Sequence, residues 1–229
     1  MTERAAAPEL TTLTIGVLGG TGPQGKGLAL RWAAAGLRVV IGSRDAGRAA
    51  ETAAELAGLV DSTDATSGAD NAGCATQADI VLVAVPWEAH DALLTSLREP
   101  LAGKVVVDCV NPVGFDKQGP YPLVVDDGSA AQRAAALLPN SRVTAAFHHV
   151  SAVILADLSI PRVDLDVLVL GDDRAATDQV RALAEAIPGV RGVYGGRLRN
   201  AGQVEALTAN LIAINRRYRT HSGIRITGL

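Results

Sequence analysis

Short apolar runs alternate along this chain with longer segments whose apolar residues recur at helical spacing. The runs are rich in Val, Ile and Leu without polar alternation, as in parallel strands buried on both faces. Strands are predicted over residues 15–18, 38–44, 65–67, 78–85, 104–110, 142–148, 165–170 and 191–194. Helices are predicted over 23–35, 46–57, 88–98, 173–187 and 200–217, and another begins at Ser129. The alternation predicts an α/β fold with a doubly wound, mostly parallel sheet.

The regular alternation of predicted strands and helices becomes less clear after residue 148, although no linker-like composition marks a boundary there. We therefore expect a domain over residues 12–147 and a smaller C-terminal domain over residues 148–229. Residues 111–127 carry Gly and Pro throughout and predict a long loop, which in a compact domain is usually functional. The last helix carries an apolar stripe that predicts packing against the rest of the protein: Val204, Leu207, Leu211 and Ile214.

Three glycines with the spacing G-x-G-x-x-G stand between the first strand and the first helix. Gly20 permits a tight turn, Gly22 allows a diphosphate to approach the backbone, and Gly25 lets the helix lie close to the sheet. Pro23 suits the first helical turn, whose free N–H groups and positive dipole end favour phosphate. This motif is weak evidence alone, but between a strand and a helix it predicts a Rossmann-type dinucleotide site.

The end of the second strand indicates which dinucleotide binds. NAD-binding proteins of this fold place an acidic residue there for the ribose 2′-hydroxyl, whereas this chain carries Ser43 and Arg44, followed by Arg48. A hydroxyl and two guanidinium groups suit the 2′-phosphate of NADP(H). Asp45 is the competing candidate for a ribose contact, and we interpret it as the N-cap of the next helix.

Charge and composition exclude several classes of partner. The net charge is -3, which gives no reason to expect nucleic acid or an anionic membrane. No apolar run reaches membrane-spanning length, and residues 1–11 lack the apolar core of a signal peptide, so we expect a cytoplasmic protein. Cys74 and Cys109 fit a reducing compartment, and their spacing resembles no zinc site.

The ends of the later strands carry the candidates for a second site, because ligands of doubly wound sheets bind beyond the carboxyl ends of the strands. Pro86 and Trp87 could wall a nicotinamide ring, or form a turn and a packing contact. His148 could line a pocket or be a satisfied structural histidine. Its neighbour His149 would point to the opposite face of an extended segment, so we expect no metal site there.

Together, residues 19–29, 42–44, 85–88, 147–148 and 222–225 resemble those of coenzyme F420-dependent NADP oxidoreductases. The resemblance covers nearly all of the chain after residue 12. It implies an enzyme that exchanges a hydride between NADP(H) and the 8-hydroxy-5-deazaflavin coenzyme F420. It also implies a homodimer whose small C-terminal domain closes the deazaflavin cleft. No protein acid or base is needed, because the hydride passes directly between the two rings.

The resemblance also assigns cofactor-binding residues to this chain. Those expected at the diphosphate are Gly20, Thr21, Gly22, Pro23, Gln24 and Gly25, and those at the 2′-phosphate are Ser43, Arg44 and Arg48. Pro86, Trp87 and Ala152 are expected near the nicotinamide, and His148, Val150 and Ser222 near the deazaflavin. Ser151 stands where some relatives have proline.

Two other functions remain open from the residues alone. The first is an NADP-dependent reductase of another small imine or carbonyl compound, which would need a proton donor near its substrate. Tyr121, Tyr194 and Tyr218 all lack the lysine four residues on that marks the short-chain type. The second is a non-enzymatic protein that senses NADP and regulates a partner.

A cluster of C-terminal arginines, including Arg219 and Arg225, could steer the anionic tail of the coenzyme F420 toward its cleft.

Overall fold

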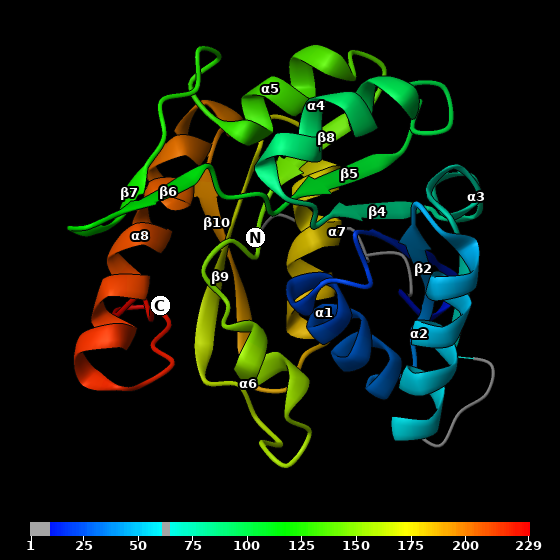
Figure 1. Ribbon diagram of the computed structural model, residues 1–229, viewed down its shortest axis with the longest axis horizontal. Helices are drawn as coiled ribbons and strands as arrows, with labels where there is room; N and C mark the ends of the chain where they lie inside the picture. Colours follow the sequence, from blue (N-terminus) through cyan, green and yellow to red (C-terminus); the bar gives the residue numbers. More distant parts are fainter. Residues whose placement is uncertain (1–9, 61–64) are drawn as a thin grey trace, which may run out of the picture.

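The computed structural model describes residues 10–60 and 65–229, and its centre is one eight-stranded sheet (Figure 1). The strand order is β10-β9-β8-β5-β4-β1-β2-β3. The strands are β1 (Thr14–Leu18), β2 (Arg38–Ser43), β3 (Thr66–Asp70), β4 (Ile80–Val83), β5 (Val105–Asp108), β8 (Arg142–Ala145), β9 (Leu165–Gly171) and β10 (Val190–Gly196). Neighbouring strands are parallel, apart from β8 and β9, which are antiparallel. The predicted doubly wound, mostly parallel sheet is confirmed.

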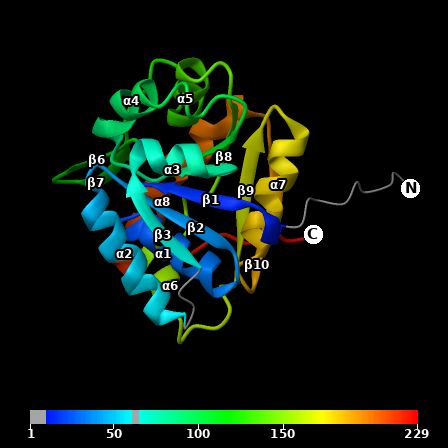
Figure 2. The same ribbon diagram turned by 90° about the vertical axis from the view of Figure 1, so that its right-hand side faces the viewer.

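Helices cover both faces of this sheet. One face packs against α1 (Pro23–Ala34), α2 (Ala46–Leu59) and α7 (Arg174–Glu185). The other face packs against α3 (Asn71–Gln77), α4 (Trp87–Ser96), α5 (Ala130–Leu137) and the first turns of α8 (Ala201–Tyr218). Figure 2 shows α3, α4 and α5 above β1, with α1 and α2 below it. The short elements are α6 (Ala152–Ala156) and the 3-10 turns Leu10–Thr12 and Leu198–Asn200.

Successive residues of the central strands enter opposite cores. In β5, Val105 and Val107 pack on the side of α1, whereas Val106 packs on the side of α4. All three side chains are buried. A strand covered on both faces has no solvent side for a polar residue, which explains the unbroken apolar runs of the sequence.

Several helix ends lie where local chemistry predicts them. The side chains of Asp45, Ser129 and Asp173 each accept a hydrogen bond from a backbone N–H in the first turn of the following helix. Each bond satisfies one of the N–H groups that a helix start leaves free. Gly36, with φ +80°, follows the end of α1. The interpretation of Asp45 as an N-cap is therefore confirmed.

Two segments differ from the prediction. Residues 111–127 are not one irregular loop, because β6 (Val113–Asp116) and β7 (Gly119–Pro122) form an antiparallel hairpin beside α8. Pro112, Pro120 and Pro122 hid this hairpin, since proline is rare in interior strands but is accepted in an isolated ribbon. Helix α2 continues through Gly58 to Leu59, and α3 was not predicted, because Gly73 and Thr76 are poor helix formers.

The predicted domain boundary at residue 148 falls in the turn after β8. Beyond it, β9 and β10 continue the same sheet, whereas α8 leaves the sheet and lies against the β6–β7 hairpin. The division into two domains stays a prediction. Among the described helices, none is both long enough and apolar enough to span a membrane. The expectation about a signal peptide concerns residues 1–11, most of which lie outside the described part of the chain.

Candidate functional site

The turn between β1 and α1 has the geometry of a phosphate-binding loop. Gly19, rather than Gly20, has the left-handed conformation, with φ +78°. A Cβ on Gly20 would lie 2.9 Å from the carbonyl oxygen of Val17, and one on Gly25 would lie 2.7 Å from that of Gly19. Gly25 therefore lets the helix approach the loop closely, as predicted. The N-cap residue, Gly22, offers no side chain, so the first N–H groups of α1 face outward.

A cleft of about 1010 Å³ opens in front of this turn, and we call it the glycine-loop cleft. One wall holds Gly19, Thr21 and Gly22 together with the residues predicted for a 2′-phosphate, Ser43, Arg44 and Arg48. Arg44 precedes α2 and Arg48 lies in its first turn, and both residues line the cleft. Neither has an ion-pair partner among residues 10–60 and 65–229. This wall is suited to an anion.

The opposite wall comes from α3 and α4. Ala89, Ala92 and Leu93 form an apolar surface on α4, and Pro86, the N-cap of that helix, lies at its edge. At the start of α3, the buried Oδ1 of Asn71 has no hydrogen-bond partner within the described residues. An apolar wall with one free acceptor suits a flat ring that carries an N–H donor.

A second cleft, of about 290 Å³, lies beyond the end of β4, and we call it the His148 cleft. Its lining comes from segments that are distant in sequence: Gln24, Ala84, Val85, Cys109, Val110, Asn111, His148, Val150 and Thr208. Ala84 and Val85 also line the glycine-loop cleft, so the two clefts adjoin at the end of β4. The structure thus brings the predicted residues Gln24, His148 and Val150 together.

His148 is buried and uncharged. Both of its ring nitrogens lack a hydrogen-bond partner in the described part of the chain, as do those of His149. Burial lowers the pKa of His148 to about 3 and that of His149 to about 4. The two residues lie in a turn after Phe147, whose φ is 67°, so the expected extended segment is wrong. In residues 10–60 and 65–229, no group of three His, Cys, Asp or Glu side chains could hold a metal ion.

Hydrogen bonds to backbone carbonyls fix the wall of the His148 cleft. Asn111 Nδ2 donates to the carbonyl oxygen of His148 at 2.9 Å. The hydroxyl of Thr208 lies 3.1 Å from Asn111 Oδ1 and 3.2 Å from the same carbonyl oxygen. Gln24 Nε2 donates to the carbonyl oxygen of Phe147 at 3.2 Å. Sequence reasoning missed Thr208, although its position four residues after Val204 on the buried stripe of the last helix could have indicated it.

Six predicted residues line neither cleft: Gly20, Pro23, Gly25, Trp87, Ala152 and Ser222. Gly20 and Gly25 belong to the turn itself, and Pro23 lines the same groove as Ala152. Trp87 packs on the ring of His90, with 5.2 Å between ring centroids, and contacts the core on the α4 side. Ala152 lines a groove between α1, α2 and α6. Ser222 lies in a separate hollow of about 200 Å³ beside Ser151, and its N–H and hydroxyl both donate to Asn215. The contacts of Trp87, Ala152 and Ser222 with the rings stay predictions.

The C-terminal arginines divide into two kinds. Arg225 forms ion pairs with Asp164 and with the buried carboxylate of Asp166, which Arg191 also contacts at 2.6 Å. Arg225 thus fastens the C-terminal segment to β9 and is not free to meet a coenzyme tail. Arg219 is exposed at the C-terminus of α8.

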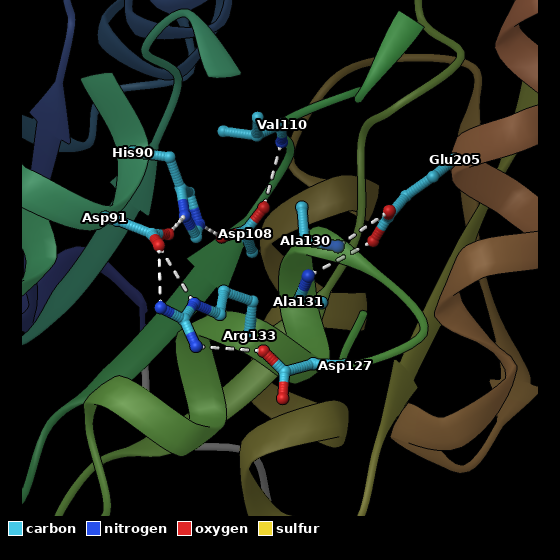
Figure 3. A network of polar contacts seen from close by, with 9 residues as sticks. All are labelled: His90, Asp91, Asp108, Val110, Asp127, Ala130, Ala131, Arg133 and Glu205. Carbon is cyan, nitrogen blue, oxygen red and sulfur yellow. Dashed lines mark hydrogen bonds and ion pairs between the residues drawn. The ribbon is translucent and has the colours of Figure 1, made fainter. Parts of the chain in front are cut away.

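A polar network that sequence reasoning did not find is centred on the buried side chains of His90 and Asp108 (Figure 3). His90 Nε2 lies 2.8 Å from Asp108 Oδ2, and its Nδ1 lies 3.0 Å from Asp91 Oδ1. Burial alone would lower the pKa of His90, but the two carboxylates together raise it. Asp108 Oδ1 also accepts the N–H of Val110, a residue of the cleft lining. The network therefore holds the end of β5 in place.

A buried carboxylate joins α8 to α5 in the same region. Glu205 accepts the N–H groups of Ala130 and Ala131, at 2.9 and 3.1 Å, in the first turn of α5 (Figure 3). Burial raises the pKa of Glu205 to about 7, against the opposing effect of these two donors. Glu205 precedes Thr208 by one turn, so this contact sets the position of the α8 wall of the His148 cleft.

Known proteins show the same sequence pattern and fold. The family model described as "NADP oxidoreductase coenzyme F420-dependent" matches residues 14–112. The F420-dependent NADP reductase of Methanothermobacter marburgensis is 44% identical over 223 residues, covering 95% of this chain and 99% of the relative. That of Methanocaldococcus jannaschii is 37% identical, with 95% and 99% covered.

Solved structures agree in fold. A putative F420-dependent NADP reductase from Arthrobacter sp. FB24 has a TM-score of 0.79 and 26% identity, and 94% of this chain and 99% of that one are covered. An imine reductase from Myxococcus stipitatus has a TM-score of 0.61 at 18% identity, with 90% and 67% covered, which shows a shared fold alone. The identity to the archaeal reductases extends over nearly the whole chain, whereas the likeness to the imine reductase is one of fold. This chain therefore belongs to the family of F420-dependent NADP reductases.

Proposed function

We propose that this protein transfers a hydride between NADP(H) in the glycine-loop cleft and coenzyme F420, whose deazaflavin ring occupies the His148 cleft. The observation that carries this proposal is the adjacency of the two clefts, because Ala84 and Val85 line both. Direct hydride transfer requires the two ring carbons to be in contact, so their sites must adjoin. Membership of the reductase family supplies the identity of the two cofactors.

The residues of the glycine-loop cleft fit NADP(H). Thr21 and Gly22 of this cleft would hold the diphosphate together with the N–H groups at the start of α1, which no side chain caps. Pro23 and Gln24, which follow in the first turn of α1 but do not line the cleft, would place this turn against the diphosphate. Ser43, Arg44 and Arg48 would hold the 2′-phosphate through charge-assisted hydrogen bonds. The free Oδ1 of Asn71 and the apolar wall on α4 fit the adenine ring with its amino donor.

The residues of the His148 cleft bind and align, and none exchanges a proton with a ring carbon. When bound, the nicotinamide and deazaflavin rings supply the carbons that give and take the hydride. His148 stays neutral because of its burial, so it presents ring nitrogens without charge to the deazaflavin. Val150 and Val85 exclude water from the junction of the clefts. Thr208 and Asn111 hold the backbone of this wall.

We also propose a homodimer located in the cytoplasm, with residues 148–229 closing the deazaflavin cleft. Thr208, which lies in this part of the chain, already contributes to the cleft lining. Phe115 and Tyr121 on the β6–β7 hairpin and Ile214 on α8 are exposed apolar side chains of the kind that a subunit interface covers. Light scattering after size-exclusion chromatography, with Phe115→Glu as the variant, tests the dimer.

The decisive experiment is anaerobic mixing of the protein with NADPH and oxidised F420. We expect reduction of F420 with stoichiometric formation of NADP+, and deuterium on the transferred face of NADPH should appear on C5 of the deazaflavin. Loss of the label to solvent would contradict direct transfer. Oxidation of NADPH by a cyclic imine or a ketone, without activity on F420, would instead favour the other reductase function. Tight NADP+ binding without any turnover would favour a sensor.

A further inference from the structure

Helix α1 holds the whole segment that follows β8. Gln24, in the first turn of α1, donates to the carbonyl oxygen of Phe147, and Trp32, two turns on, meets the ring of Phe147 edge to face at 5.5 Å between centroids. Between these two contacts lie Gly27 and Arg31, which face the short helix α6. The helix whose N-terminus faces the diphosphate site therefore also carries one wall of the His148 cleft.

Arg31 makes the most extensive of these contacts. Although it is charged, it is only 4% exposed. Its guanidinium donates four hydrogen bonds, all to backbone carbonyl oxygens: those of Ile154 at 2.7 Å, Leu155 at 2.9 Å, Asp157 at 2.6 Å and Ile160 at 2.8 Å. It forms no ion pair with a carboxylate among residues 10–60 and 65–229. A buried arginine usually has such a partner, so this arrangement calls for an explanation.

The four carbonyl groups explain why Arg31 has no carboxylate partner, because α6 itself offers no N–H donor to them. The last carbonyls of a helix have no partner within that helix, and α6 has only five residues, Ala152–Ala156. A helix of this length is unstable without tertiary contacts. Arg31 satisfies the end of α6 and the turn after it with a single side chain. The positive charge also suits the negative end of the helix dipole.

Gly27 sets how closely the two helices approach. It lies four residues before Arg31, on the same face of α1. A Cβ at Gly27 would lie 2.8 Å from Leu155 Cβ, so α6 packs directly on the backbone of α1. Val150, of the cleft lining, immediately precedes the N-cap of α6, Ser151. A shift of α6 along α1 would therefore move Val150 and His148.

We propose that Arg31 is a positioning residue for hydride transfer, which acts through α6 to set the distance between the deazaflavin wall and the dinucleotide site. The inference rests on the proposed placement of the deazaflavin in the His148 cleft. Arg31 lines neither cleft. Since a misplacement of about 1 Å can slow a reaction by about 10²-fold, the hold on α6 affects the rate of transfer more than the binding of NADP(H).

The test compares Arg31→Met and Arg31→Lys with a matched control, Lys104→Met. Lys104 donates to the carbonyl oxygens of Ala75, Thr76 and Ala78 at the end of α3, so it is also a cation at a helix C-terminus, but it lies away from the His148 cleft. For each protein, thermal unfolding gives the stability and titration calorimetry gives the NADP+ dissociation constant. Stopped-flow absorbance gives the single-turnover rate with NADPH and its deuterated form.

We expect Arg31→Met to slow hydride transfer by about tenfold or more at saturating F420, with NADP+ affinity within about twofold of the wild type. Arg31→Lys should restore only part of the rate and stay severalfold slower than the wild type, because an ammonium group can donate to only some of the carbonyls. Lys104→Met should lower the melting temperature but keep the rate. If Arg31→Met loses stability like Lys104→Met and keeps the wild-type rate, the inference is wrong.

Three further outcomes show which part of the inference fails. If Arg31→Met does not fold, Arg31→Lys decides: a severalfold slower transfer with unchanged NADP+ affinity supports positioning, and a wild-type rate overturns it. If the wild-type protein itself does not reduce F420, the proposed function fails before any variant is compared. An equal loss of NADP+ affinity and rate in Arg31→Met would show that the residue supports the whole of α1 and does not position one wall.

Discussion

The two adjoining clefts are built in opposite ways. The wall of the glycine-loop cleft that faces the phosphates comes from one stretch of chain between Gly19 and Arg48, and it carries two guanidinium groups without ion-pair partners among the described residues. The lining of the His148 cleft comes from segments near residues 24, 84, 110, 148 and 208, and its one titratable ring, that of His148, is neutral. Recognition of an anion can be encoded locally, whereas the alignment of two rings requires the assembled fold.

The two clefts also differ in what their polar groups already contact. In the His148 cleft, the side chains of Asn111 and Thr208 bond to each other and to the carbonyl oxygen of His148. Such groups hold the wall and have little capacity left for a charged ligand. In the glycine-loop cleft, the donors remain available. With the cofactors placed as proposed, the glycine-loop cleft supplies affinity and the His148 cleft supplies geometry.

The largest expected effect comes from removing the positive charges of the glycine-loop cleft. Replacing Arg44 and Arg48 together with alanine should raise the KM for NADPH by roughly 10²–10⁴-fold, since each charge-assisted hydrogen bond contributes about 1.5–3 kcal/mol. The KM for NADH should barely change, because NADH has no 2′-phosphate. Steady-state kinetics with both cofactors measures the effect. Arg174→Ala, at a residue whose side chain is 94% exposed and outside both clefts, is the matched control. Equal losses for NADPH and NADH would contradict the assignment.

The same contrast explains what could be predicted from the sequence. Gly25, Ser43 and Arg44 act through local spacing, so their positions followed from the order of residues along the chain. His148 was a candidate because it follows a predicted strand, and Val150 was assigned through the family resemblance. Thr208 was missed, because its partners lie 97 and 60 residues away. For Trp87 the sequence left two readings open, a wall of the nicotinamide site or a packing contact, and the structure shows its ring packed on that of His90.

The β6–β7 hairpin and the left-handed Phe147 show a second limit of the sequence. Prolines made the hairpin look irregular, and a bulky residue with φ 67° is rare enough that no sequence rule anticipates it. Phe147 holds this conformation because Trp32 packs on its ring and Gln24 bonds to its carbonyl oxygen. Both restraints come from α1, which is more than a hundred residues earlier in the chain.

The neutrality of the His148 cleft predicts how stability depends on pH. Burial holds the pKa of His148 at about 3 in the folded protein, whereas in the unfolded chain it is near 6.5. Between these values only the unfolded chain binds the proton, so this contribution to stability falls as the pH decreases below about 6.5. It should amount to about 2–3 kcal/mol between about pH 7.5 and pH 4.5. Above pH 6.5 it is constant.

A difference measurement isolates this contribution. Urea unfolding of the wild type and of His148→Gln at several pH values gives the two free energies of unfolding. Glu205, whose raised pKa of about 7 has the opposite effect on stability over part of this range, is common to both proteins and cancels. We expect the advantage of the wild type over the variant to shrink as the pH is lowered. A difference independent of pH would show that His148 is protonated in the folded state or accessible to water.

Two glycine substitutions test how much the backbone of the glycine turn contributes to stability and to NADP+ binding. In Gly25→Ala, the new Cβ would lie 2.7 Å from Gly19 O, so we expect a loss of about 1–3 kcal/mol of stability and weaker NADP+ binding. Gly58→Ala is the matched control, because no atom of the described residues lies within 4 Å of its Cβ and the site is helical. It should stabilise the protein by about 0.4–1 kcal/mol. Thermal unfolding and calorimetry measure both. Unchanged NADP+ affinity in Gly25→Ala would contradict the role given to the turn.

The smallest effect concerns a single hydroxyl of the His148 cleft. Thr208→Val keeps the shape of the side chain but removes the donor that Asn111 Oδ1 and the carbonyl oxygen of His148 share. A hydrogen bond of this kind is worth about 0.5–1.5 kcal/mol, so the KM for F420 should rise roughly two- to tenfold. NADP+ affinity should not change, since Thr208 does not line the glycine-loop cleft. In Thr76→Val, the control, the lost hydroxyl donates to Ala72 O on the exposed side of α3. The role given to Thr208 would be wrong if Thr76→Val changed the KM for F420 as much as Thr208→Val does. If Thr208→Val weakened the binding of NADP+ as much as that of F420, the two clefts would not be separable, and the division between affinity and geometry would fail.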